Sequence, residues 1–237
     1  MLRIYRTLAK SPYQKEWVRR LDDWSIIHLM TTAVATTPSA TRRPAGETRE
    51  RLLRIGAELI NTQGYNHTGI NAIVQAAGVP KGSFYHYFAS KEDFGLAVID
   101  RFDAHYRSKL DTALNRPRMA PLIRLRGYLE TGLAEMIDAE FCSGCLIGNL
   151  GQELAGRHPA FRARLDQVFS GWVARFAACL DEARVRGDFA NDISSAQLAE
   201  FLLAGWEGAL LRAKVTHEPA PLRAFIDLFF SQVLRTA

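Results

Sequence analysis

The sequence predicts an all-helical protein, and three observations support this. Apolar residues recur at intervals of three and four along most of the chain, which is the repeat of an α-helix, and they do not alternate as they would in a strand. Glycine and proline fall between the periodic segments and divide the chain into separate helices. The chain has 237 residues, of which 48% are hydrophobic, so it can bury one or two helical cores.

Residues 1–45 are predicted to form a flexible basic arm. Residues 1–46 carry eight Lys and Arg against three acids, and the stretch from 31 to 44, rich in Thr, Ala, Pro and Ser, has no helical repeat. Met30 is an alternative start of translation, in which case the residues before it would not belong to the protein and residues 1–30 would contain a misassigned start. The charge of the arm would attract DNA phosphates or would only keep the chain in solution, and composition supports both readings.

Four helices are predicted between residue 47 and the break at Pro117. The first covers 47–63 and ends at Gly64, which can adopt the left-handed backbone of a helix C-cap. A short second helix is capped near Thr68, and the turn Gly78-Val79-Pro80 then leads into a third helix that begins at Lys81. Lys91 opens a long fourth helix. The residues predicted to face inward are Leu52, Ile55, Leu59, Ile70, Ile73, Val74, Ala77, Phe94, Val98, Phe102 and Tyr106.

Further helices are predicted at 122–139, 145–155, 159–186, 194–215 and 219–235. The helix at 159–186 carries an apolar stripe from Phe161 to Leu180 and is predicted to lie in the core. The last helix is apolar around nearly its whole circumference, so it needs burial on more than one side, and a partner subunit is the simplest source. Gly205 and Gly208 in the preceding helix would permit close approach of a symmetry mate. The sequence therefore predicts a homodimer formed through the last two helices.

Two short helices joined by a glycine turn form the arrangement that places the second helix in the major groove of DNA. The run Gly78-Val79-Pro80-Lys81-Gly82-Ser83-Phe84-Tyr85-His86-Tyr87-Phe88, followed by Ser90-Lys91-Glu92, resembles the signature of the TetR family of transcriptional regulators. This resemblance implies a helix-turn-helix DNA-binding domain over residues 46–93. It also implies an effector-binding and dimerisation domain over residues 94–237.

The resemblance also implies which residues meet DNA. Phe84 and Phe88 would pack inward, and the opposite side would present Lys81, Gly82, Ser83, Tyr85, His86 and Tyr87. By their chemistry, Lys81 and Lys91 would neutralise phosphates, Tyr87 and Thr68 would donate hydrogen bonds to phosphate oxygens, and Ser83, Tyr85 and His86 would contact bases. Two alternatives stay open: His86 without a base contact, and Tyr85 packed against the first helix.

Two later segments, 141–154 and 205–214, resemble the acrylate- and electrophile-responsive branch of the same family. Cys145 lies in the first turn of a predicted helix, after Ser143 and Gly144, where unpaired backbone N–H groups would favour the thiolate and raise its reactivity. The resemblance makes Cys145 the sensing thiol and Lys214 its cationic neighbour. The alternative for Cys145 is ordinary helix packing.

Three further residues are candidates for the effector site. Glu207 shares one helical stripe with Lys214, and that stripe is predicted to line the effector pocket, although a solvated, salt-bridged face would give the same pattern. Trp206 would form a wall of the pocket or lie in the dimer core. Tyr128 is a candidate of the same kind.

Cys142 and Cys145 form a C-x-x-C pair, which is open to three interpretations. Cys142 could resolve an oxidised Cys145 into a disulfide, it could be incidental, or the pair could be half of a zinc site. Zinc is disfavoured, because the sequence has no second C-x-x-C and no paired histidines to complete the ligands. Cys179 is predicted to be buried. We predict neither a metal nor a cofactor.

The functional prediction is a transcriptional repressor, not an enzyme, that leaves its operator when a small unsaturated acid, electrophile or oxidant acts near Cys145. The signal would reach the DNA-reading helices through the long fourth helix. One alternative is a repressor with a reversible, non-covalent effector, and another of a different class is a C-x-x-C thiol oxidoreductase. No apolar run is long enough to span a membrane and no secretory signal is present, so we expect a cytoplasmic protein.

Overall fold

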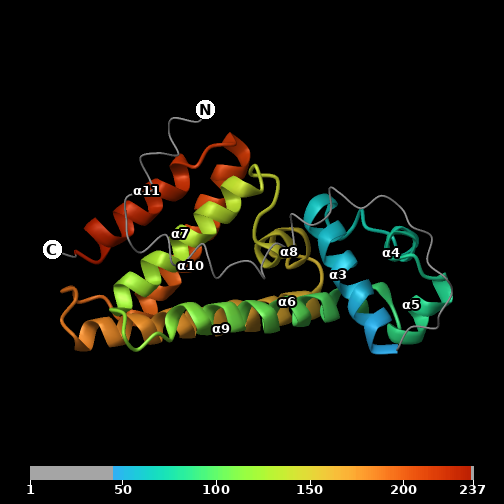
Figure 1. The fold of residues 1–237 in the computed structure, drawn as a ribbon, viewed down its shortest axis with the longest axis horizontal. Coiled ribbons are helices and arrows are strands. Elements are labelled where there is room, and N and C mark those ends of the chain that lie inside the picture. The colour runs from blue at the N-terminus through green and yellow to red at the C-terminus, as the bar shows by residue number, and fades with distance from the viewer. Residues whose placement is uncertain (1–44, 236–237) are drawn as a thin grey trace. The chain divides into compact units, whose positions relative to one another are not determined.

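The computed structural model describes residues 45–235, so the predicted arm over residues 1–44 lies outside the described part. Every regular element within residues 45–235 is a helix, which confirms the predicted fold class. The elements (Figure 1) are α3 (Ala45–Gln63), α4 (Ile70–Ala77), α5 (Lys81–Tyr87), α6 (Lys91–Leu114), α7 (Pro121–Asp138), α8 (Leu146–Leu154), α9 (Pro159–Val185), α10 (Ser195–Thr216), α11 (Ala220–Leu228) and the π-helical turn η1 (Phe229–Val233).

Helices α3, α4 and α5 pack around an aromatic core. Phe84 and Phe88 point inward from α5 as predicted, and each is at most 2% exposed. Both rings contact Phe94 at the start of α6, with centroid distances of 5.2 and 4.9 Å. Residues four apart lie on one face of a helix, so these contacts hold α5 by one side and leave its other side facing outward.

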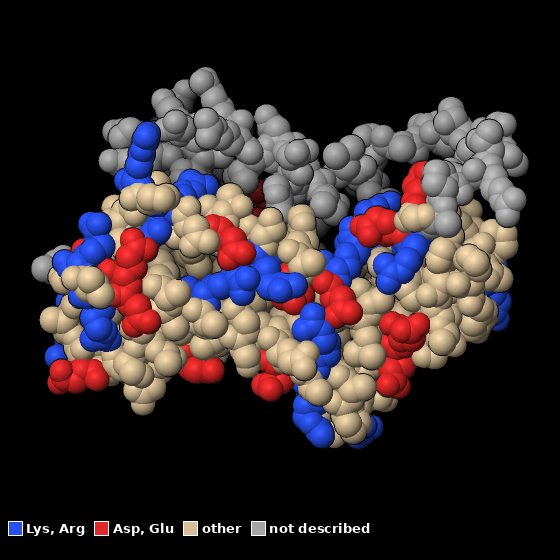
Figure 2. Space-filling view, turned by 90° about the horizontal axis from the view of Figure 1, so that it is seen from below, with Lys and Arg blue, Asp and Glu red and all other residues tan. Residues whose placement is uncertain are grey.

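The long helices α6 and α9 run side by side (Figure 1) and join the two ends of the described part. Ion pairs connect them, from Arg164 to Asp100 and Asp103 and from Arg175 to Asp111. Figure 2 views this face and shows Lys and Arg interspersed with Asp and Glu. The face therefore lacks the continuous basic stripe that a DNA-binding surface carries.

Helices α7, α9, α10 and α11 pack together at the end away from α4 and α5 (Figure 1). The predicted core position of the 159–186 segment is confirmed in α9, where the large side chains at most 2% exposed are Phe161, Leu165, Val168, Trp172 and Leu180. Helix α8 is short and contacts both α3 and α9. Within the described residues, no helix is both long and apolar enough to cross a bilayer.

The C-terminal helix is covered by its own chain more fully than predicted. Its large apolar side chains at most 5% exposed are Leu222, Ile226, Phe229, Phe230 and Leu234. The π-helical turn at 229–233 shifts the helical register, so a broader set of side chains can face inward. The prediction for Gly205 is also wrong, because a Cβ there would collide with the ring of Phe225 in the same subunit. A Cβ at Gly208 would meet no atom within 4 Å, so Gly208 faces outward.

One exposed apolar face remains on the last two helices. Phe201, Leu211 and Val215 of α10 are 52, 45 and 64% exposed, and Leu228 of α11 is 57% exposed. Ala204 and Gly208 lie between them at helical spacing and are also exposed. We call these six residues the exposed apolar stripe.

Candidate nucleic-acid interface and thiol site

A tight turn aims α5 away from α4. Gly78 has φ +59°, a left-handed conformation that favours glycine, and its N–H bonds to the carbonyl oxygens of Val74 and Gln75 at the end of α4. Pro80 then caps α5 with an extended backbone. The residues of the predicted turn therefore set the angle between the two short helices.

The outward side of α5 presents polar and aromatic groups. Lys81, Gly82, Tyr85 and His86 are exposed, and Ser83 and Tyr87 are half-buried. Tyr85 is 53% exposed, whereas packing against α3 would have buried it. A Cβ at Gly82 would meet nothing within 4 Å, so packing inside the subunit does not require glycine there. This side of α5 is open to a partner that approaches closely.

Thr68 does not belong to that surface. Its side chain is fully buried, and Oγ1 donates a hydrogen bond of 2.6 Å to the carbonyl oxygen of Gly64. Thr68 Oγ1 also accepts a hydrogen bond of 3.2 Å from Gln63 Nε2. The prediction that the Thr68 hydroxyl donates to a phosphate is therefore wrong, because its proton is used within the turn after α3.

Lys91 is also tied to that turn. Its ammonium lies 4.4 Å from the centroid of the Tyr65 ring and donates a hydrogen bond of 3.4 Å to the carbonyl oxygen of Asn66. Partial burial lowers the pKa of Lys91, and the charge of Glu153 opposes this effect. The side chain is half-buried, so its amino group still has access to solvent.

Cys145 is the N-cap of α8, one residue before the position predicted. Its Sγ accepts a hydrogen bond of 3.4 Å from the backbone N–H of Gly148. The carboxyl of Glu207, from α10, lies over the same first turn, where a Cβ at Gly148 would collide with Oε2. The thiol and this carboxyl lie close enough for each to shift the pKa of the other. Gly148 thus makes the space that brings Glu207 to Cys145.

These surroundings favour the neutral thiol over the thiolate that the sequence predicts. Burial raises the pKa of Cys145 well above its ordinary value, and the charge of Glu207 raises it further. The N–H group of Gly148 acts in the predicted direction and lowers the pKa, but its effect is smaller. Sequence reasoning counted the helix terminus and could not see the acid that α10 places opposite it.

Among the described residues, no interaction joins Lys214 to the thiol that it was predicted to neighbour. Lys214 lies seven residues after Glu207 on α10, which corresponds to about 10 Å along the axis. No hydrogen bond or ion pair joins it to Cys145 among the described residues, and its charge is not among the causes of the shifted pKa of Cys145. The charged residue that the structure places beside Cys145 is Glu207.

Tyr128 and Trp206 are both buried, at 5 and 6% exposure, but only Tyr128 belongs to the thiol site. Its hydroxyl is hydrogen-bonded to that of Tyr106, and Cys145 and Glu207 both influence its pKa, which burial raises. Trp206 packs between Gly132 of α7 and the Phe225 ring, 6.2 Å away. Trp206 is therefore a core residue of its own subunit in the described structure.

Tyr106 also belongs to the thiol site, although the sequence analysis assigned it only to the core. Burial raises its pKa well above the ordinary value, and the charges of Tyr128, Cys145 and Glu207 raise it further. Its ring lies 4.2 Å from that of Trp172, whose buried Nε1–H has no hydrogen-bond acceptor among the described residues. Tyr106 lies one turn beyond Phe102 on the same inner stripe, so the helical repeat assigns it to the core. Its hydroxyl was the one feature of the sequence that could have marked it as a site residue.

The other two thiols lie apart from this cluster. Cys142 is exposed, and its Sγ is 3.5 Å from the carbonyl oxygen of Glu140. Cys179 is buried as predicted, and burial raises its pKa to about 11. No disulfide is present, and the described residues contain no group of three or more His, Cys, Asp or Glu placed to hold a metal.

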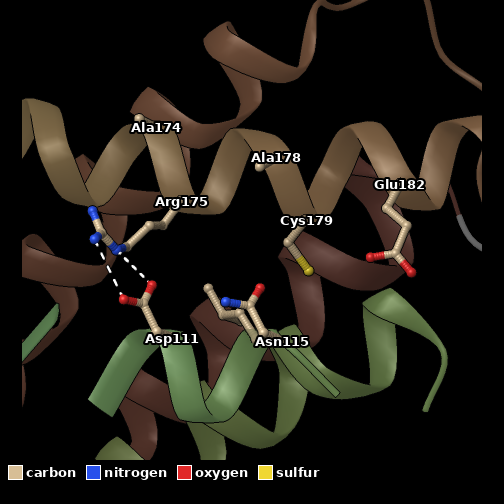
Figure 3. Close-up of a pocket in the computed structure, with 8 residues that line it drawn as sticks. Asp111, Asn115, Ala174, Arg175, Ala178, Cys179 and Glu182 are labelled. Atoms are coloured by element: carbon tan, nitrogen blue, oxygen red, sulfur yellow. Dashed lines mark hydrogen bonds and ion pairs between the residues drawn. The ribbon is translucent and has the colours of Figure 1, made fainter. Parts of the chain in front are cut away.

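Cys179 lines a cavity of about 390 Å³ between α6 and α9 (Figure 3). The ion pair of Asp111 with Arg175 bounds the cavity on one side, and Glu182 lies on the other. Glu182 also pairs with the buried guanidinium of Arg124. The polar groups of this cavity are thus mostly engaged with one another, and none belongs to the cluster around Cys145.

Helix α8 links the thiol site directly to the first three helices. Asn149, four residues after Cys145, donates a hydrogen bond of 3.0 Å to Asn61 Oδ1 on α3. Glu153, four residues further, accepts hydrogen bonds of 2.8 and 2.6 Å from the backbone N–H groups of Tyr65 and Asn66. These three residues share one face of α8, so one short helix contacts the thiol site, α3 and the turn after α3.

Two families of known proteins match this chain. Residues 52–98 match the family described as bacterial regulatory proteins, tetR family. Residues 121–229 match the family described as tetracyclin repressor-like, C-terminal domain. The first match contains α5, the second contains Tyr128, Cys145 and Glu207, and Tyr106 lies between the two.

Individual relatives agree with these matches. The transcriptional regulator AcuR of Cereibacter sphaeroides is 40% identical over 82% of this chain and 93% of its own length. A crystal structure of the regulatory protein TetR from Rhodobacter sphaeroides is 42% identical, covers 77% of this chain and 96% of that one, and has a TM-score of 0.73. The reduced form of the repressor NemR from Escherichia coli is 31% identical, with coverages of 79 and 96% and a TM-score of 0.72.

Proposed function

Because this chain belongs to the TetR family of bacterial regulatory proteins, in the branch that includes AcuR and NemR, we propose that it is a repressor released from its operator by a small electrophile, oxidant or unsaturated acid acting at Cys145. The observation that carries the DNA-binding half is the outward side of α5, held by Phe84 and Phe88 within the matched residues 52–98. We expect it to act in the cytoplasm, where operator DNA lies.

The contacts with DNA are proposed from the exposure of α5. Lys81 would neutralise a phosphate, and Ser83, Tyr85 and His86 would meet base edges in the major groove. Tyr87 would donate to a phosphate oxygen. Gly82 would let the DNA backbone approach, since nothing in the subunit needs glycine there. Lys91, at the start of α6, would reach a phosphate beside the turn after α3.

The effector half is proposed from the cluster of Cys145, Glu207, Tyr106 and Tyr128. A half-buried thiol beside a carboxyl and two hydroxyls can bind a small polar molecule and react with it. The names of two relatives support this class of regulator, since AcuR is a transcriptional regulator and NemR a transcriptional repressor. Cys142 would be a resolving thiol only under oxidants.

Two other functions have less support. A reversible, non-covalent effector would fit the same cluster, and the neutral state of Cys145 favours that alternative more than the sequence did. A C-x-x-C oxidoreductase carries its motif between a strand and a helix, whereas here the motif joins α7 to α8. The matched relatives are described as transcriptional regulators.

The signal would pass through α8 as well as through α6. We predicted α6 as the main route because it joins both halves of the described part. Helix α8 offers a shorter route, since its N-cap is the sensing residue and Glu153 near its other end holds two backbone N–H groups of the turn after α3. A change at Cys145 that tilts α8 would therefore move the DNA-reading helices directly.

A second copy of this chain is the proposed partner for the exposed apolar stripe. Operators of helix-turn-helix proteins have two half-sites, so a dimer supplies the two recognition helices. The stripe lies on the last two helices, as predicted, although α11 contributes only Leu228 among its large exposed apolar side chains. Gly208 in the middle of the stripe would permit close approach of the partner's backbone.

Operator release tests the proposal. The protein is bound to fluorescent promoter DNA of its own gene and titrated with acrylate, N-ethylmaleimide and hypochlorous acid. Wild type and Cys142→Ser should release the DNA, and Cys145→Ser should stay bound. Serine is a good N-cap, so Cys145→Ser should keep the start of α8. Equal release by Cys145→Ser would support the non-covalent alternative, and failure of wild type to bind the DNA would overturn the whole proposal.

A further inference from the structure

The thiol that would sense electrophiles lies beside a carboxyl, and this arrangement is unlike that of a cysteine activated by a cation. A neutral thiol is a weak nucleophile, and it becomes a strong one when a base removes its proton as the new bond forms. Glu207 is positioned to be that base, because its Oε2 and Cys145 both lie against Gly148 in the first turn of α8.

We infer that Cys145 and Glu207 form a nucleophile and base pair that reacts with uncharged conjugated carbonyl compounds and discriminates against conjugated carboxylates. This inference rests on the proposed function and narrows its effector class. It assigns Glu207 the role of proton acceptor and the two tyrosine hydroxyls the role of carbonyl ligands.

The reaction balances without any other reagent. The Glu207 carboxylate takes the proton from Sγ while Sγ forms a bond to the β-carbon of the alkene. The π electrons move to the carbonyl oxygen and give an enolate. The protonated carboxyl of Glu207 then returns the proton to the α-carbon. The thiol has been added across the double bond, and no group leaves and nothing is oxidised.

Burial raises the pKa of Glu207, which makes its carboxylate a stronger base than an ordinary glutamate. The pKa of the Cys145 thiol is raised as well, so the base has to lie against the thiol to take its proton as the new bond forms. Both residues are half-buried, so neither is sealed in the core of the subunit.

Hydrogen-bond donors for the carbonyl oxygen lie in the same cluster. The hydroxyls of Tyr106 and Tyr128 are hydrogen-bonded to each other, so one of their two protons is free for another acceptor. Next to Tyr106, the buried Nε1–H of Trp172 has no acceptor among the described residues. A ligand that brings a carbonyl oxygen would satisfy donors that the subunit leaves unused.

The discrimination against carboxylates follows from charge. The acids that influence the pKa values of Cys145 and its tyrosine neighbours are Glu135 and Glu207. Glu135 is paired with Lys109, whereas Glu207 has no ion pair among the described residues. A ligand carboxylate would stand beside the Glu207 carboxylate, and like charges at close range in a partly buried site repel strongly. An amide, ester or imide of the same shape carries no such penalty.

Acrylamide and acrylate form a matched pair of probes, because they have nearly the same shape and differ in charge. The rate of adduct formation at Cys145 is measured by peptide mass spectrometry on the full chain, in a Cys142→Ser background. Each rate is divided by the rate of N-acetylcysteine with the same reagent at the same pH. This normalised rate should be at least tenfold higher for acrylamide than for acrylate.

The variant Glu207→Gln tests the role of the base. It should react with acrylamide at least tenfold more slowly than the background protein, and its normalised preference should fall toward one. The control Glu200→Gln, an exposed glutamate two turns away on α10, should change neither value. If Glu207→Gln does not fold, Glu207→Asp, which withdraws the carboxylate, should slow acrylamide in the same way.

Two results would overturn the inference: a normalised preference near one in the background protein, or an unchanged acrylamide rate in Glu207→Gln. The readout does not depend on DNA. If adducts form with the expected dependence on Glu207 while the operator stays bound, the inference holds and the proposed release mechanism fails. If the operator is released and the adduct rates ignore Glu207, the proposed function holds and this inference fails.

Discussion

Glu207 is a carboxyl group whose surroundings oppose its ionisation. Burial raises its pKa, and the neighbouring Cys145 thiol offsets this only in part. A pKa raised in the folded state stabilises the fold below the ordinary value of 4.5, and this stability is lost as pH rises through the folded-state value. Glu207→Gln keeps an acceptor oxygen and stays neutral. At pH 8 the variant should therefore be more stable than wild type, and the difference should vanish below about pH 4.

Urea unfolding at pH 4, 6 and 8 measures this difference. The matched control is Glu200→Gln, whose exposed carboxyl should give the same stability as wild type at each pH within experimental error. A wild type more stable than Glu207→Gln at pH 8 would show that the folded protein favours the charged carboxylate, contrary to the burial argument.

Single residues were predicted well where the local sequence decides their surroundings. Phe84 and Phe88 lie four apart on a short helix, so one of its faces had to be inside. Cys145 shows the opposite case, because its ionisation depends on Glu207, 62 positions later in the chain. Thr68 is a residue type that often forms an exposed helix cap. Its hydroxyl is buried because of the path of the turn after α3, which the local sequence does not reveal.

Helices were predictable because each depends on a repeat and on caps that are local in sequence. Every predicted helix is present, and Gly78, Ser90 and Ser194 act as caps where the chain leaves or enters a helix. The π-helical turn at 229–233 was not predictable, because a change of register depends on what the side chains pack against. The burial of α11 within its own subunit also depends on side-chain packing, so it was not predictable either.

Glu153 provides a test of α8 as an element that joins two sites. Glu153→Gln has one acceptor oxygen where two backbone N–H groups need one each, so at least one hydrogen bond is lost. The expected cost is about 1–2 kcal/mol. Amide hydrogen exchange at Tyr65 and Asn66 should become faster, and operator release should need more effector than in wild type, because α8 would no longer hold the turn.

The neighbouring variant Gln152→Ala is the control, since Gln152 is exposed on the same helix. It should leave hydrogen exchange at Tyr65 and Asn66 unchanged. Slow exchange retained in Glu153→Gln would mean that other contacts hold the turn and that α8 does not carry the signal.

For the whole molecule, assembly depends on the exposed apolar stripe. Leu211 lies within it and is 45% exposed in the single chain. Leu211→Asp would place two carboxylates in a two-fold interface, where burying each charge costs several kcal/mol. The variant should sediment as a monomer at micromolar concentration. Its operator affinity should fall at least tenfold, because one recognition helix would bind without the other.

The control is Val185→Asp, which changes an apolar side chain that is 90% exposed at the end of α9 and outside the stripe. It should keep the oligomeric state of the wild type. Dimers that persist in Leu211→Asp, or that dissociate in Val185→Asp, would place the subunit contact elsewhere. The sequence predicted which two helices would form the interface. The structure was needed to find which of their residues stay exposed, because Gly205 packs against Phe225 of its own subunit.

The placement of Cys145, Asn149 and Glu153 along one face of α8 has a consequence for engineering. The three residues span about 12 Å, so the chemistry that receives a signal and the contacts that transmit it are separate positions on one short rod. Substitutions at 145 and 207 could retune a biosensor to new analytes, while 149 and 153 keep the same output. Directed libraries could therefore vary the input residues alone and leave the promoter and the reporter unchanged.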